Sequence, residues 1–466
     1  MSCVPLTDCP SSIHFIGVGG IGMSGLARLM LCRGVRVTGS DVQENELIGS
    51  LRRSGARITI GHAARNVGEV EAVAYSTAIK PDNAEMEEAR RRGIPVYHRS
   101  EVLECLVAGT EGIAVTGTHG KTTTAGMLGW TLVRAGLDPT VLVGGVVHDL
   151  GSNARGGRGR HAVFEADESD RSFHNLHPTH AVITNIEPDH LDQYGTLDAI
   201  VASFGEFMRG LSPSGACVLC ADCSTLSGLR DQAPWSVTYG LNGGGDYTAR
   251  NVEISVAGTS FDVTGPEGEL GRASVRFPGR QYAANSLAVI AMALQLGVDV
   301  ECALESVRLY RGTARRFEHL GTFRGADVID DYAHHPTEVQ ATILSALQVA
   351  RGRLIVVFQP HLFSRTMFFM DDFAASFDQP DHVFLTEIYA AREDPATATV
   401  SGEDLARRVE ARRGARPTSY VPLAADAIGL LSDVVSEGDT VLLMGAGDIR
   451  DVSERLAGVE AGHAAA

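Results

Sequence analysis

Lysine is almost absent from this chain of 466 residues: only Lys80 and Lys121 occur among its 40 basic residues. A function that requires a lysine side chain therefore has two candidates. The formal net charge is −17, which argues against broad electrostatic attachment to nucleic acid or to an anionic membrane, and we expect neither as a partner. Any phosphate ligand must then be held by a local group of residues.

Long apolar runs are also missing. No stretch of about 18 uncharged apolar residues occurs, so no membrane span is expected. The first ten residues contain neither a basic segment nor an apolar core, which argues against a signal peptide. Eight cysteines in a chain of this length are typical of reduced thiols in a cytosolic protein, and we expect a cytoplasmic location.

Cys217, Cys220 and Cys223 share a C-x-x-C-x-x-C spacing that could hold zinc or an iron–sulfur cluster. The next cysteine is Cys302, so no fourth ligand lies nearby. The same segment also has the pattern of a strand that runs into a turn. The second interpretation is favoured.

Hydrophobic residues make up 44% of the chain and charged residues 21%, which is ordinary globular usage. At about 150 residues per domain the length suggests three domains. Apolar runs rich in β-branched residues alternate with helical stretches along the chain, which is typical of parallel sheets flanked by helices. We therefore predict an α/β protein with domains at 1–108, 109–312 and 313–466.

Individual strands are predicted from short apolar runs between turn residues. The clearest lie at 13–18, 35–41, 112–116, 162–165, 181–186, 327–330, 353–358, 382–386 and 440–444. Helices are expected from the first glycine turn to about Cys32 and from Lys121 to near Gly136. Residues 246–277 carry short polar alternation with glycine and proline, which favours an antiparallel patch.

The segment from Thr116 to Thr123 reads Thr-Gly-Thr-His-Gly-Lys-Thr-Thr and lies between a predicted strand and a helix. Glycines let backbone N–H groups turn onto phosphate oxygens, and the N-terminus of the helix favours an anion. Lys121 supplies a charge for the terminal phosphates, and the Thr122 hydroxyl can reach magnesium. Val115 replaces the first glycine of the usual P-loop pattern, so this is a variant loop that predicts a nucleoside triphosphate site.

A second glycine turn, Gly17-Val-Gly-Gly-Ile-Gly22, follows the first strand and satisfies G-x-G-x-x-G. Asp41 ends the next strand, where an acid can accept a hydrogen bond from a ribose hydroxyl. The motif indicates a diphosphate on a helix N-terminus, and both a nicotinamide dinucleotide and a UDP-sugar would suit it. The motif alone decides neither.

Acidic and histidine residues follow four other strands. The segments that contain these residues are Glu165-Ala-Asp-Glu-Ser-Asp170, Asn185 to Asp192, Asp330 to Pro336 and Phe358 to Thr366. A carboxylate at a strand end beside a phosphate loop commonly holds Mg²⁺ directly or through water. We expect the first two clusters to converge on one edge of a sheet.

With these pieces in order, the chain resembles the Mur ligases over essentially its full length. The resemblance rests on the motifs at 17–25, 116–123, 165–170, 184–192, 315–317 and 330–336. It implies three domains: a Rossmann-like N-terminal domain that binds a UDP-sugar, a central P-loop ATPase domain, and a Rossmann-like C-terminal domain that brings the amino acid and completes the ATP site.

The resemblance also implies roles for particular residues. The UDP-sugar diphosphate would lie on the turn of Gly17, Gly19, Gly20 and Gly22, with Asp41 beside it. ATP would contact Gly117, Thr118, His119, Gly120, Lys121, Thr122, Thr123, Asn285, Arg316 and Asp331. Thr122 and Glu165 would hold one magnesium ion and His190 a second. Tyr332, His334 and Arg365 would lie near the amino acid and the transferred phosphate, with Lys121, His190, His334 and Arg365 as catalytic residues.

The chain departs from the family pattern at two places. The adenine segment usually reads Gly-Arg-His-Asn-x-x-Asn, but here Gln281 and Tyr282 follow Gly-Arg. Leu362 stands where relatives often have arginine. No lysine follows Lys121, whereas later ligases of the pathway use a carbamylated lysine, so the resemblance is to the branch that adds alanine.

The activity that the resemblance implies is ATP- and Mg²⁺-dependent ligation of L-alanine to the carboxylate of UDP-N-acetylmuramate, in peptidoglycan precursor synthesis. The carboxylate would form an acyl phosphate, and His190 or His334 would accept a proton from the amine. A recycling ligase that adds a tripeptide, a nicotinamide dehydrogenase and an ATP-driven switch stay as alternatives. The protein would be a monomer or a homodimer.

Overall fold

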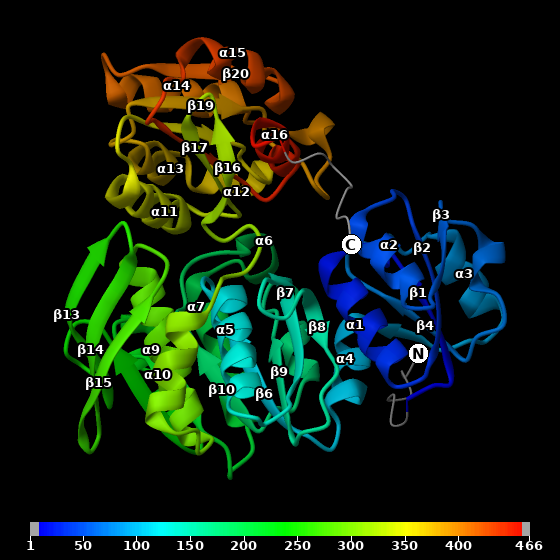
Figure 1. Ribbon diagram of the computed structural model, residues 1–466. Coiled ribbons are helices and arrows are strands. Elements are labelled where there is room, and N and C mark those ends of the chain that lie inside the picture. The colour runs from blue at the N-terminus through cyan, green and yellow to red at the C-terminus, as the bar shows by residue number, and fades with distance from the viewer. Residues whose placement is uncertain (1–8, 459–466) are drawn as a thin grey trace.

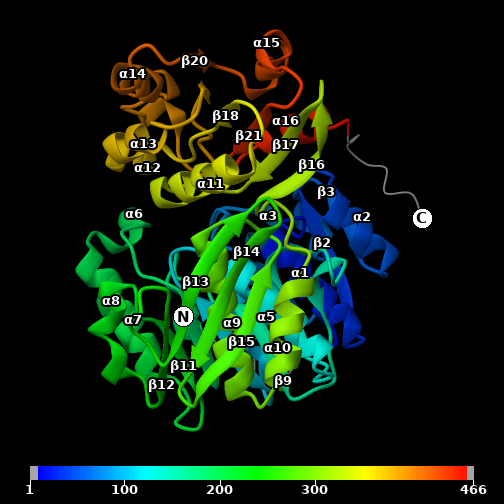
Figure 2. The ribbon, with the colours of Figure 1, turned by 60° about the vertical axis from the view of Figure 1, so that its left-hand side comes forward.

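The computed structural model describes residues 9–458, which form three sheets in series (Figure 1). The N-terminal domain (blue) lies to the right of the middle domain (cyan to green), and the third domain (yellow to red) lies above the middle domain. Each sheet is flanked by helices, as the second view also shows (Figure 2). The prediction of a three-domain α/β fold is therefore confirmed.

The N-terminal sheet has five parallel strands in the order β3-β2-β1-β4-β5. They are β1 (Ser12–Ile16), β2 (Arg36–Asp41), β3 (Arg57–Ile60), β4 (Ala72–Tyr75) and β5 (Val96–His98). The helices are α1 (Ile21–Cys32), α2 (Glu46–Arg53), α3 (Ala84–Arg91) and α4 (Arg99–Val107). The central strand β1 is buried along its whole length, so the glycine turn that follows it lies at the carboxyl edge of the sheet.

The middle sheet has ten strands in the order β15-β14-β13-β12-β11-β10-β6-β9-β7-β8. They are β6 (Glu111–Thr116), β7 (Thr140–Val147), β8 (Ser152–Arg155), β9 (His161–Glu165), β10 (His180–Ile183), β11 (Cys217–Cys220), β12 (Ser236–Gly240), β13 (Tyr247–Ser255), β14 (Gly258–Gly265) and β15 (Gly268–Val275). Strands β13, β14 and β15 pair antiparallel, which confirms the patch predicted at 246–277.

The helices of the middle domain are α5 (Lys121–Arg134), α6 (Leu191–Tyr194), α7 (Leu197–Arg209), α8 (Ser224–Ser227), α9 (Arg280–Gln295) and α10 (Val300–Leu309). Helices α5 and α9 pack side by side, and nearly every residue of α9 from Tyr282 to Ala293 is buried. A helix that is apolar on most faces belongs in a core. This packing fixes the N-terminus of α5, where the phosphate loop ends.

The third sheet has six strands in the order β16-β17-β21-β18-β19-β20, and all but β16 are parallel. They are β16 (Glu318–Phe323), β17 (Ala326–Asp331), β18 (Leu354–Phe358), β19 (His382–Thr386), β20 (Thr418–Val421) and β21 (Thr440–Met444). The helices are α11 (Pro336–Val349), α12 (Phe363–Phe368), α13 (Met370–Ser376), α14 (Gly402–Arg413), α15 (Ala427–Val434) and α16 (Ile449–Leu456). Short 3₁₀ turns lie at Ala64–Val67, Ser172–Asn175, Arg230–Gln232, Pro395–Thr397 and Ala424–Asp426.

Every strand predicted from the sequence is present, with differences at its ends. The strand predicted at 181–186 is β10, which stops at Ile183. The Thr184 amide still donates to the Thr116 carbonyl of β6 at 3.1 Å, and the side chains of Thr184 and Asn185 hydrogen-bond to the phosphate loop. Cys217 and Cys220 lie on β11, as the strand interpretation of that segment predicted, and burial raises the pKa of both thiols.

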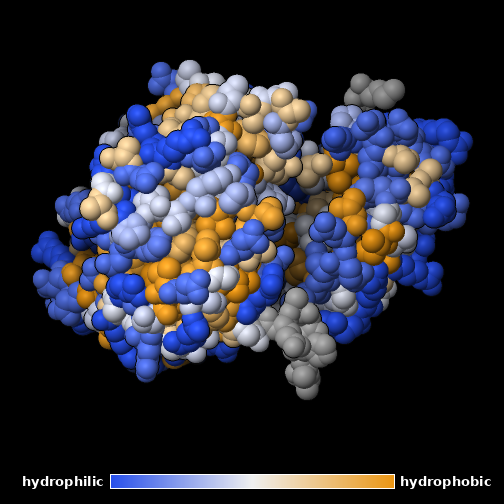
Figure 3. All heavy atoms as spheres, turned by 90° about the horizontal axis from the view of Figure 1, so that it is seen from above, coloured by the Kyte–Doolittle hydropathy of each residue, from blue (hydrophilic) through white to orange (hydrophobic). Residues whose placement is uncertain are grey.

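The links between the sheets are short. Helix α4 ends at Val107 and β6 begins at Glu111, while α10 ends at Leu309 and β16 begins at Glu318. The boundaries predicted from the sequence, 108/109 and 312/313, fall within these two links and stay predictions. Seen from above, a furrow separates the N-terminal domain, on the right, from the rest of the molecule (Figure 3). Within residues 9–458, no helix has the length and apolar character needed to cross a membrane.

Candidate active site

The predicted phosphate loop lies at the carboxyl end of β6, directly before α5. Gly117 and Gly120 have φ angles of 122° and 81°, in the region that favours glycine. A Cβ on Gly120 would lie 2.7 Å from Asn285 Oδ1, and one on Gly117 would collide with Thr184. The loop therefore requires both glycines, and it places the unpaired N-terminal amides of α5 beside the space where an anion can bind.

Residues after β10 hold this loop from outside. Asn185 Oδ1 accepts a hydrogen bond from the amide of His119 at 2.9 Å, and Asn185 Nδ2 donates to the His119 carbonyl at 3.1 Å. The amide of Thr118 donates to the Asn185 carbonyl at 3.1 Å. The loop backbone is thus fixed within the middle domain alone.

Lys121 lies at the mouth of the loop and is mostly buried. Its Nζ donates to the carbonyl of Gly117 at 2.6 Å and to Glu168 Oε1 at 2.7 Å. Burial lowers the pKa of Lys121, but the charges of Glu168 and Asp167 outweigh burial and hold the pKa above its ordinary value. The ammonium is therefore charged, and it is positioned before any nucleotide binds.

Thr122, Glu165 and His190 line one cavity, as the expected magnesium sites require. The Thr122 hydroxyl donates to Glu165 Oε2 at 3.2 Å, and the other oxygen of Glu165 accepts from the amide of Gly144. His190 Nδ1 is buried with no hydrogen-bond partner among the described residues, and burial lowers the pKa of the ring. Two oxygen donors and a neutral imidazole with an unused nitrogen fit a divalent cation.

The cavity that contains these residues has a volume of about 350 Å³ and receives side chains from all three domains. Arg99 comes from α4 of the N-terminal domain, Lys121 from the middle domain, and Arg365 from α12 of the third domain. Arg99 Nη2 donates to Asp167 Oδ2 at 2.6 Å, so it already joins the first two domains. A reaction that needs groups from three domains can take place here.

A buried ion pair joins the middle and third domains at the wall of this cavity. Arg365 Nη2 donates to Asp189 Oδ1 at 3.0 Å and Arg365 Nε donates to the same oxygen at 3.2 Å. The two residues are only 6% and 7% exposed. Burial raises the pKa of Asp189, but the Arg365 charge outweighs it and holds that pKa far below the ordinary range.

His334 follows β17 and lies in the same cavity. Its Nδ1 is 2.9 Å from the carbonyl oxygen of Tyr332, which can only accept, so Nδ1 carries the proton and Nε2 has a lone pair. Burial lowers the pKa of His334 to about 4, and the Arg365 charge acts in the same direction. The ring is therefore neutral near pH 7. Tyr332 packs under the guanidinium groups of Arg315 and Arg316, at 4.7 Å and 5.1 Å.

A second cavity, of about 470 Å³, lies between the middle and third domains on the other side of the loop. Asn285, Arg316 and Asp331 line it together with His119 and Gly120. Arg316 also reaches the loop, since its Nη2 donates to the Thr122 hydroxyl at 3.2 Å. The structure thus brings together the residues expected at ATP from two domains, with Thr123 at the same wall.

The two departures from the family pattern have structural explanations. Tyr282 is buried and stacks on Phe277 at 5.0 Å, and Gln281 Nε2 donates to Ser345 at 2.8 Å, so both residues support α9 and α11. Leu362 is buried in the wall of the 350 Å³ cavity, where it has a φ of 71°. Positive charge at that wall comes from Arg365 and from Arg392 of the loop after β19.

The N-terminal glycine turn lines a third cavity, of about 880 Å³, to which Gly17, Gly19, Gly20, Gly22 and Asp41 all contribute. Asp41 Oδ2 accepts from the amide of Gly19 at 2.8 Å, so the acid holds the turn closed as well as facing the cavity. Lys80 also lines this cavity. Gly22, Arg99 and Arg392 line both this cavity and the 350 Å³ cavity, so the two spaces adjoin.

His119 extends from the loop toward the third domain. Its Nε2 lies 3.4 Å from Glu187 Oε2 and its Nδ1 lies 3.2 Å from Glu338 Oε1. Burial lowers the pKa of His119, but the hydrogen bonds and charges of both carboxylates outweigh burial and raise it to about 9. The protonated ring is therefore held between two acids.

This arrangement predicts a pH-dependent contribution to stability. A pKa raised from about 6.5 in the unfolded chain to about 9 in the folded protein stabilises the fold fully below about pH 6.5, and the gain is lost as pH rises through 9. The Tm of His119→Asn should lie below that of the wild type at pH 6.5, and the difference should shrink by the equivalent of about 3 kcal/mol by pH 9.5. Thermal melts across this range measure it. A difference in Tm that stays constant from pH 6.5 to pH 9.5 would contradict the assignment.

Several residues in these cavities were not anticipated as site residues: Lys80, Arg99, Glu168, Asp189, Glu338 and Arg392. For Lys80, the only indication of a functional role in the sequence is that the chain contains just two lysines. Glu168 and Asp189 belong to motifs that the sequence singled out, and Glu338 follows another, but their partners are far away in the chain. The one group of potential metal ligands closely spaced among the described residues, His119, Glu187 and His335, contains no cysteine.

Family models match the three domains in order. The Mur ligase family catalytic domain matches residues 12–110, the Mur ligase middle domain matches 115–293, and the Mur ligase glutamate ligase domain matches 315–447. The three matches together span most of the chain.

Individual relatives match along nearly the whole length. The chain is 42% identical to a UDP-N-acetylmuramate–L-alanine ligase of Anaeromyxobacter sp. (strain Fw109-5), covering 97% of this chain and 98% of the relative. It is 44% identical to the ligase of that name from Salinibacter ruber, with coverage of 95% and 93%. Among solved structures, UDP-N-acetylmuramate-alanine ligase from Thermotoga maritima matches with a TM-score of 0.83, 31% identity and coverage of 96% and 98%. A murein peptide ligase from Psychrobacter arcticus matches with a TM-score of 0.72, 25% identity and coverage of 98% and 100%.

Proposed function

The chain belongs to the Mur ligase family, and we propose that it joins L-alanine to the carboxylate of UDP-N-acetylmuramate with hydrolysis of ATP to ADP and phosphate, in peptidoglycan precursor synthesis. The observation that supports the proposal is that the 880 Å³ and 350 Å³ cavities adjoin and share the lining residues Gly22, Arg99 and Arg392. A diphosphate on the glycine turn leaves the acid end of the sugar nucleotide free to extend to Lys121.

The first step forms an acyl phosphate. The muramate carboxylate attacks the γ-phosphate of ATP, its oxygen bonds to phosphorus, and ADP leaves. Bringing a carboxylate to about 5 Å from a doubly charged phosphoryl group costs roughly 6–7 kcal/mol at an effective dielectric constant near 20. Lys121 and Arg316, which both reach the loop, reduce this repulsion before the groups meet.

Thr122 and Glu165 would hold one magnesium ion at the loop, and His190 a second. Such ions, when bound, neutralise phosphate oxygens and keep the reacting groups in line. The chain's own contribution is to prepare these donors: Gly144 fixes Glu165, and burial keeps the His190 ring neutral.

The second step forms the amide. The amine of alanine attacks the acyl carbon, a tetrahedral intermediate forms, and phosphate leaves. We assign proton acceptance from the amine to His334, because its ring is neutral and its Nε2 has a lone pair. Arg365 and Tyr332, on the same wall, would orient the amino acid and the departing phosphate.

Binding of the sugar nucleotide should also depend on Arg392, which comes from the third domain and lines both adjoining cavities. We predict that Arg392→Ala raises the KM for UDP-N-acetylmuramate about tenfold, because a hydrogen bond to a charged group contributes about 1.5 kcal/mol or more. The KM for ATP should change less than twofold. Initial-rate kinetics with each substrate varied in turn measure both values.

Arg407→Ala, on the exposed face of α14, is the matched control and should leave both KM values unchanged. An equal rise in both KM values for Arg392→Ala would contradict the placement of Arg392 on the sugar nucleotide.

The function itself is tested by omitting substrates one at a time. Phosphate release should require ATP, UDP-N-acetylmuramate and L-alanine together, and an equal rate without alanine would count against ligation. Replacing alanine with the tripeptide separates this activity from the recycling ligase, and the 42–44% identity to alanine ligases favours alanine. A dehydrogenase would leave Lys121 without a role and predicts an absorbance change with NAD.

We place the reaction in the cytoplasm. The support is that Cys217 and Cys220 carry free thiols, which suit a reducing compartment.

A further inference from the structure

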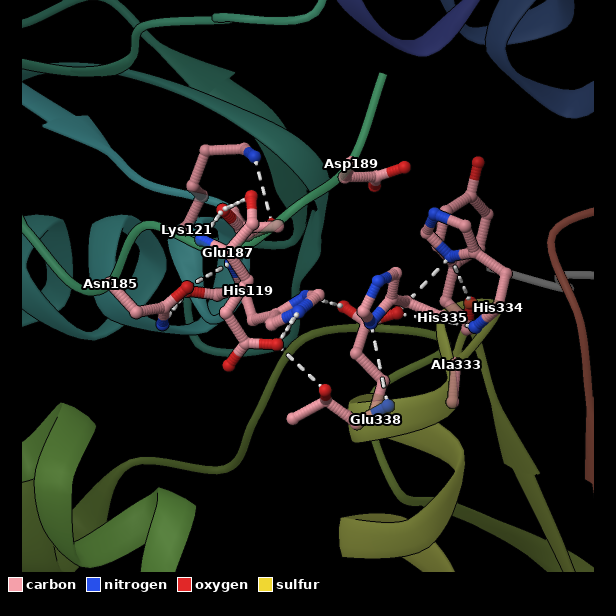
Figure 4. A network of polar contacts seen from close by, with 12 residues as sticks. His119, Lys121, Asn185, Glu187, Asp189, Ala333, His334, His335 and Glu338 are labelled. Carbon is pink, nitrogen blue, oxygen red and sulfur yellow. Dashed lines mark hydrogen bonds and ion pairs between the residues drawn. The ribbon is translucent and has the colours of Figure 1, made fainter. Parts of the chain in front are cut away.

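Glu338 lies where the third domain meets the phosphate loop, and it contacts two histidines at once (Figure 4). It belongs to the first turn of α11 and is mostly buried. Its Oε1 is 3.2 Å from His119 Nδ1, across the domain interface. Its Oε2 accepts from the amide of His334 at 3.2 Å and lies 3.3 Å from His334 Nδ1. One carboxylate therefore connects the loop with the residue that we assign to proton acceptance.

Within the loop, the contacts of the His119 ring depend on the position of the third domain. Its backbone is held by Asn185 and Thr184 of the middle domain. Its ring, by contrast, lies between Glu187 of the middle domain and Glu338 of the third. If the third domain moves away, the backbone contacts remain and the Glu338 contact is lost.

The charges around Glu338 favour its ionised form. Burial raises the pKa of Glu338, but His334, His119 and Arg316 outweigh burial and hold it well below its ordinary value. The Arg316 guanidinium also reaches Thr122 in the loop. The carboxylate thus faces two cations, the protonated His119 ring and the Arg316 guanidinium, and the His119 contact exists only when the third domain is docked.

We propose that Glu338 is a positioning residue: by binding His119 and His334 together, it couples docking of the third domain to the working shape of the phosphate loop and to the orientation of the His334 ring. This inference rests on the proposed function, since it assigns Glu338 a part in that reaction. Glu338 acts through the two histidines, so its removal should slow turnover more than it weakens substrate binding.

The residues around His119 do not have the donor set of a metal site. His119, Glu187 and His335 offer atoms within 4.8 Å of one another. However, His335 Nδ1 accepts from the amide of Thr337 at 3.4 Å, so its Nε2 carries the proton that is donated to the carbonyl of Pro188 at 3.1 Å. Both nitrogens are used, and only two donors remain. A hydrogen-bonded coupling fits these contacts better.

A double-mutant cycle tests the coupling. His119→Asn and Glu338→Gln should each lower kcat, by about tenfold and about thirtyfold, with KM for UDP-N-acetylmuramate within twofold of the wild type. Glu338→Gln should have the larger effect on kcat because it also weakens the contact of residue 338 with His334. In the Glu338→Gln background, His119→Asn should lower kcat by less than a further twofold.

The control is Glu410→Gln, on the exposed face of α14 in the same domain, which should leave kcat unchanged. Circular dichroism of each variant at the assay temperature confirms that the variant is folded.

Two results would overturn the inference. The first is a double variant whose loss of kcat equals the product of the two single losses. The second is that both single variants retain kcat within twofold of the wild type. The proposed function fails separately, if the wild-type enzyme shows no alanine-dependent phosphate release. If the wild type has that activity but the two substitutions act independently in the cycle, only the role of Glu338 is excluded.

Discussion

Replacing Lys121 by alanine should lower turnover roughly a thousandfold while leaving the affinity for UDP-N-acetylmuramate within about twofold of the wild type. The ammonium is the loop's own charge at the terminal phosphates, held there by Gly117 and Glu168. Burial raises the pKa of Glu168 to about 7, so without the Lys121 charge this carboxyl takes up a proton, and no ammonium remains at the terminal phosphates. Single-turnover phosphate release and equilibrium binding of the sugar nucleotide measure the two effects.

Lys80→Ala is the natural control, since Lys80 is the only other lysine and lines the sugar-nucleotide cavity. It should show the opposite pattern, a higher KM for UDP-N-acetylmuramate with kcat close to the wild type. Comparable losses of turnover and of sugar-nucleotide binding in Lys121→Ala would contradict the division of the two sites between domains.

Asp189→Ala should produce the second largest effect, a loss of turnover of at least a hundredfold together with a lower Tm. The variant leaves the Arg365 guanidinium buried without its partner, which costs about 3–5 kcal/mol. Because the pair joins two domains, much of that cost should appear as undocking of the third domain. Thermal melts and small-angle scattering, with activity, measure the result.

The double variant Asp189→Ala/Arg365→Met separates stability from chemistry. Replacing the unpaired Arg365 guanidinium should restore most of the lost Tm, because an apolar side chain can fill a buried ion-pair site at little cost. Activity should stay low, since Arg365 lines the reaction cavity. Full recovery of activity in the double variant would show that the pair is only structural.

The local parts of this site follow from the sequence. The loop from Gly117 to Gly120 is recognisable because a strand, two glycines and Lys121 must occur in that order to hold a phosphate. The glycine turn after β1 is recognisable for the same reason. Both depend on neighbours in the chain, so a single sequence contains the signal.

The contacts between domains do not follow from the sequence. Asp189 and Arg365 are separated by 176 positions, and nothing in either segment indicates the other. The same is true of His119 and Glu338, whose meeting depends on how the third sheet docks on the middle domain. Burial of a charge is a property of the assembled domains and not of a short segment.

One departure from the family pattern illustrates this limit. The missing arginine at Leu362 suggests a weaker anion site when the motif is read alone. In the structure, Arg392 reaches the same cavity from the loop after β19, 30 positions later in the chain. Positive charge at that wall is thus supplied by a different element, which only the folded chain reveals.

The most direct test of the account follows the carboxylate oxygen of the sugar nucleotide. With UDP-N-acetylmuramate labelled with ¹⁸O in its carboxylate, each turnover should transfer one labelled oxygen to inorganic phosphate, which mass spectrometry detects. This transfer occurs because the carboxylate oxygen bonds to phosphorus at Lys121 and leaves with it. Unlabelled phosphate, or label recovered in AMP, would contradict capture of the terminal phosphoryl group by the sugar's acid.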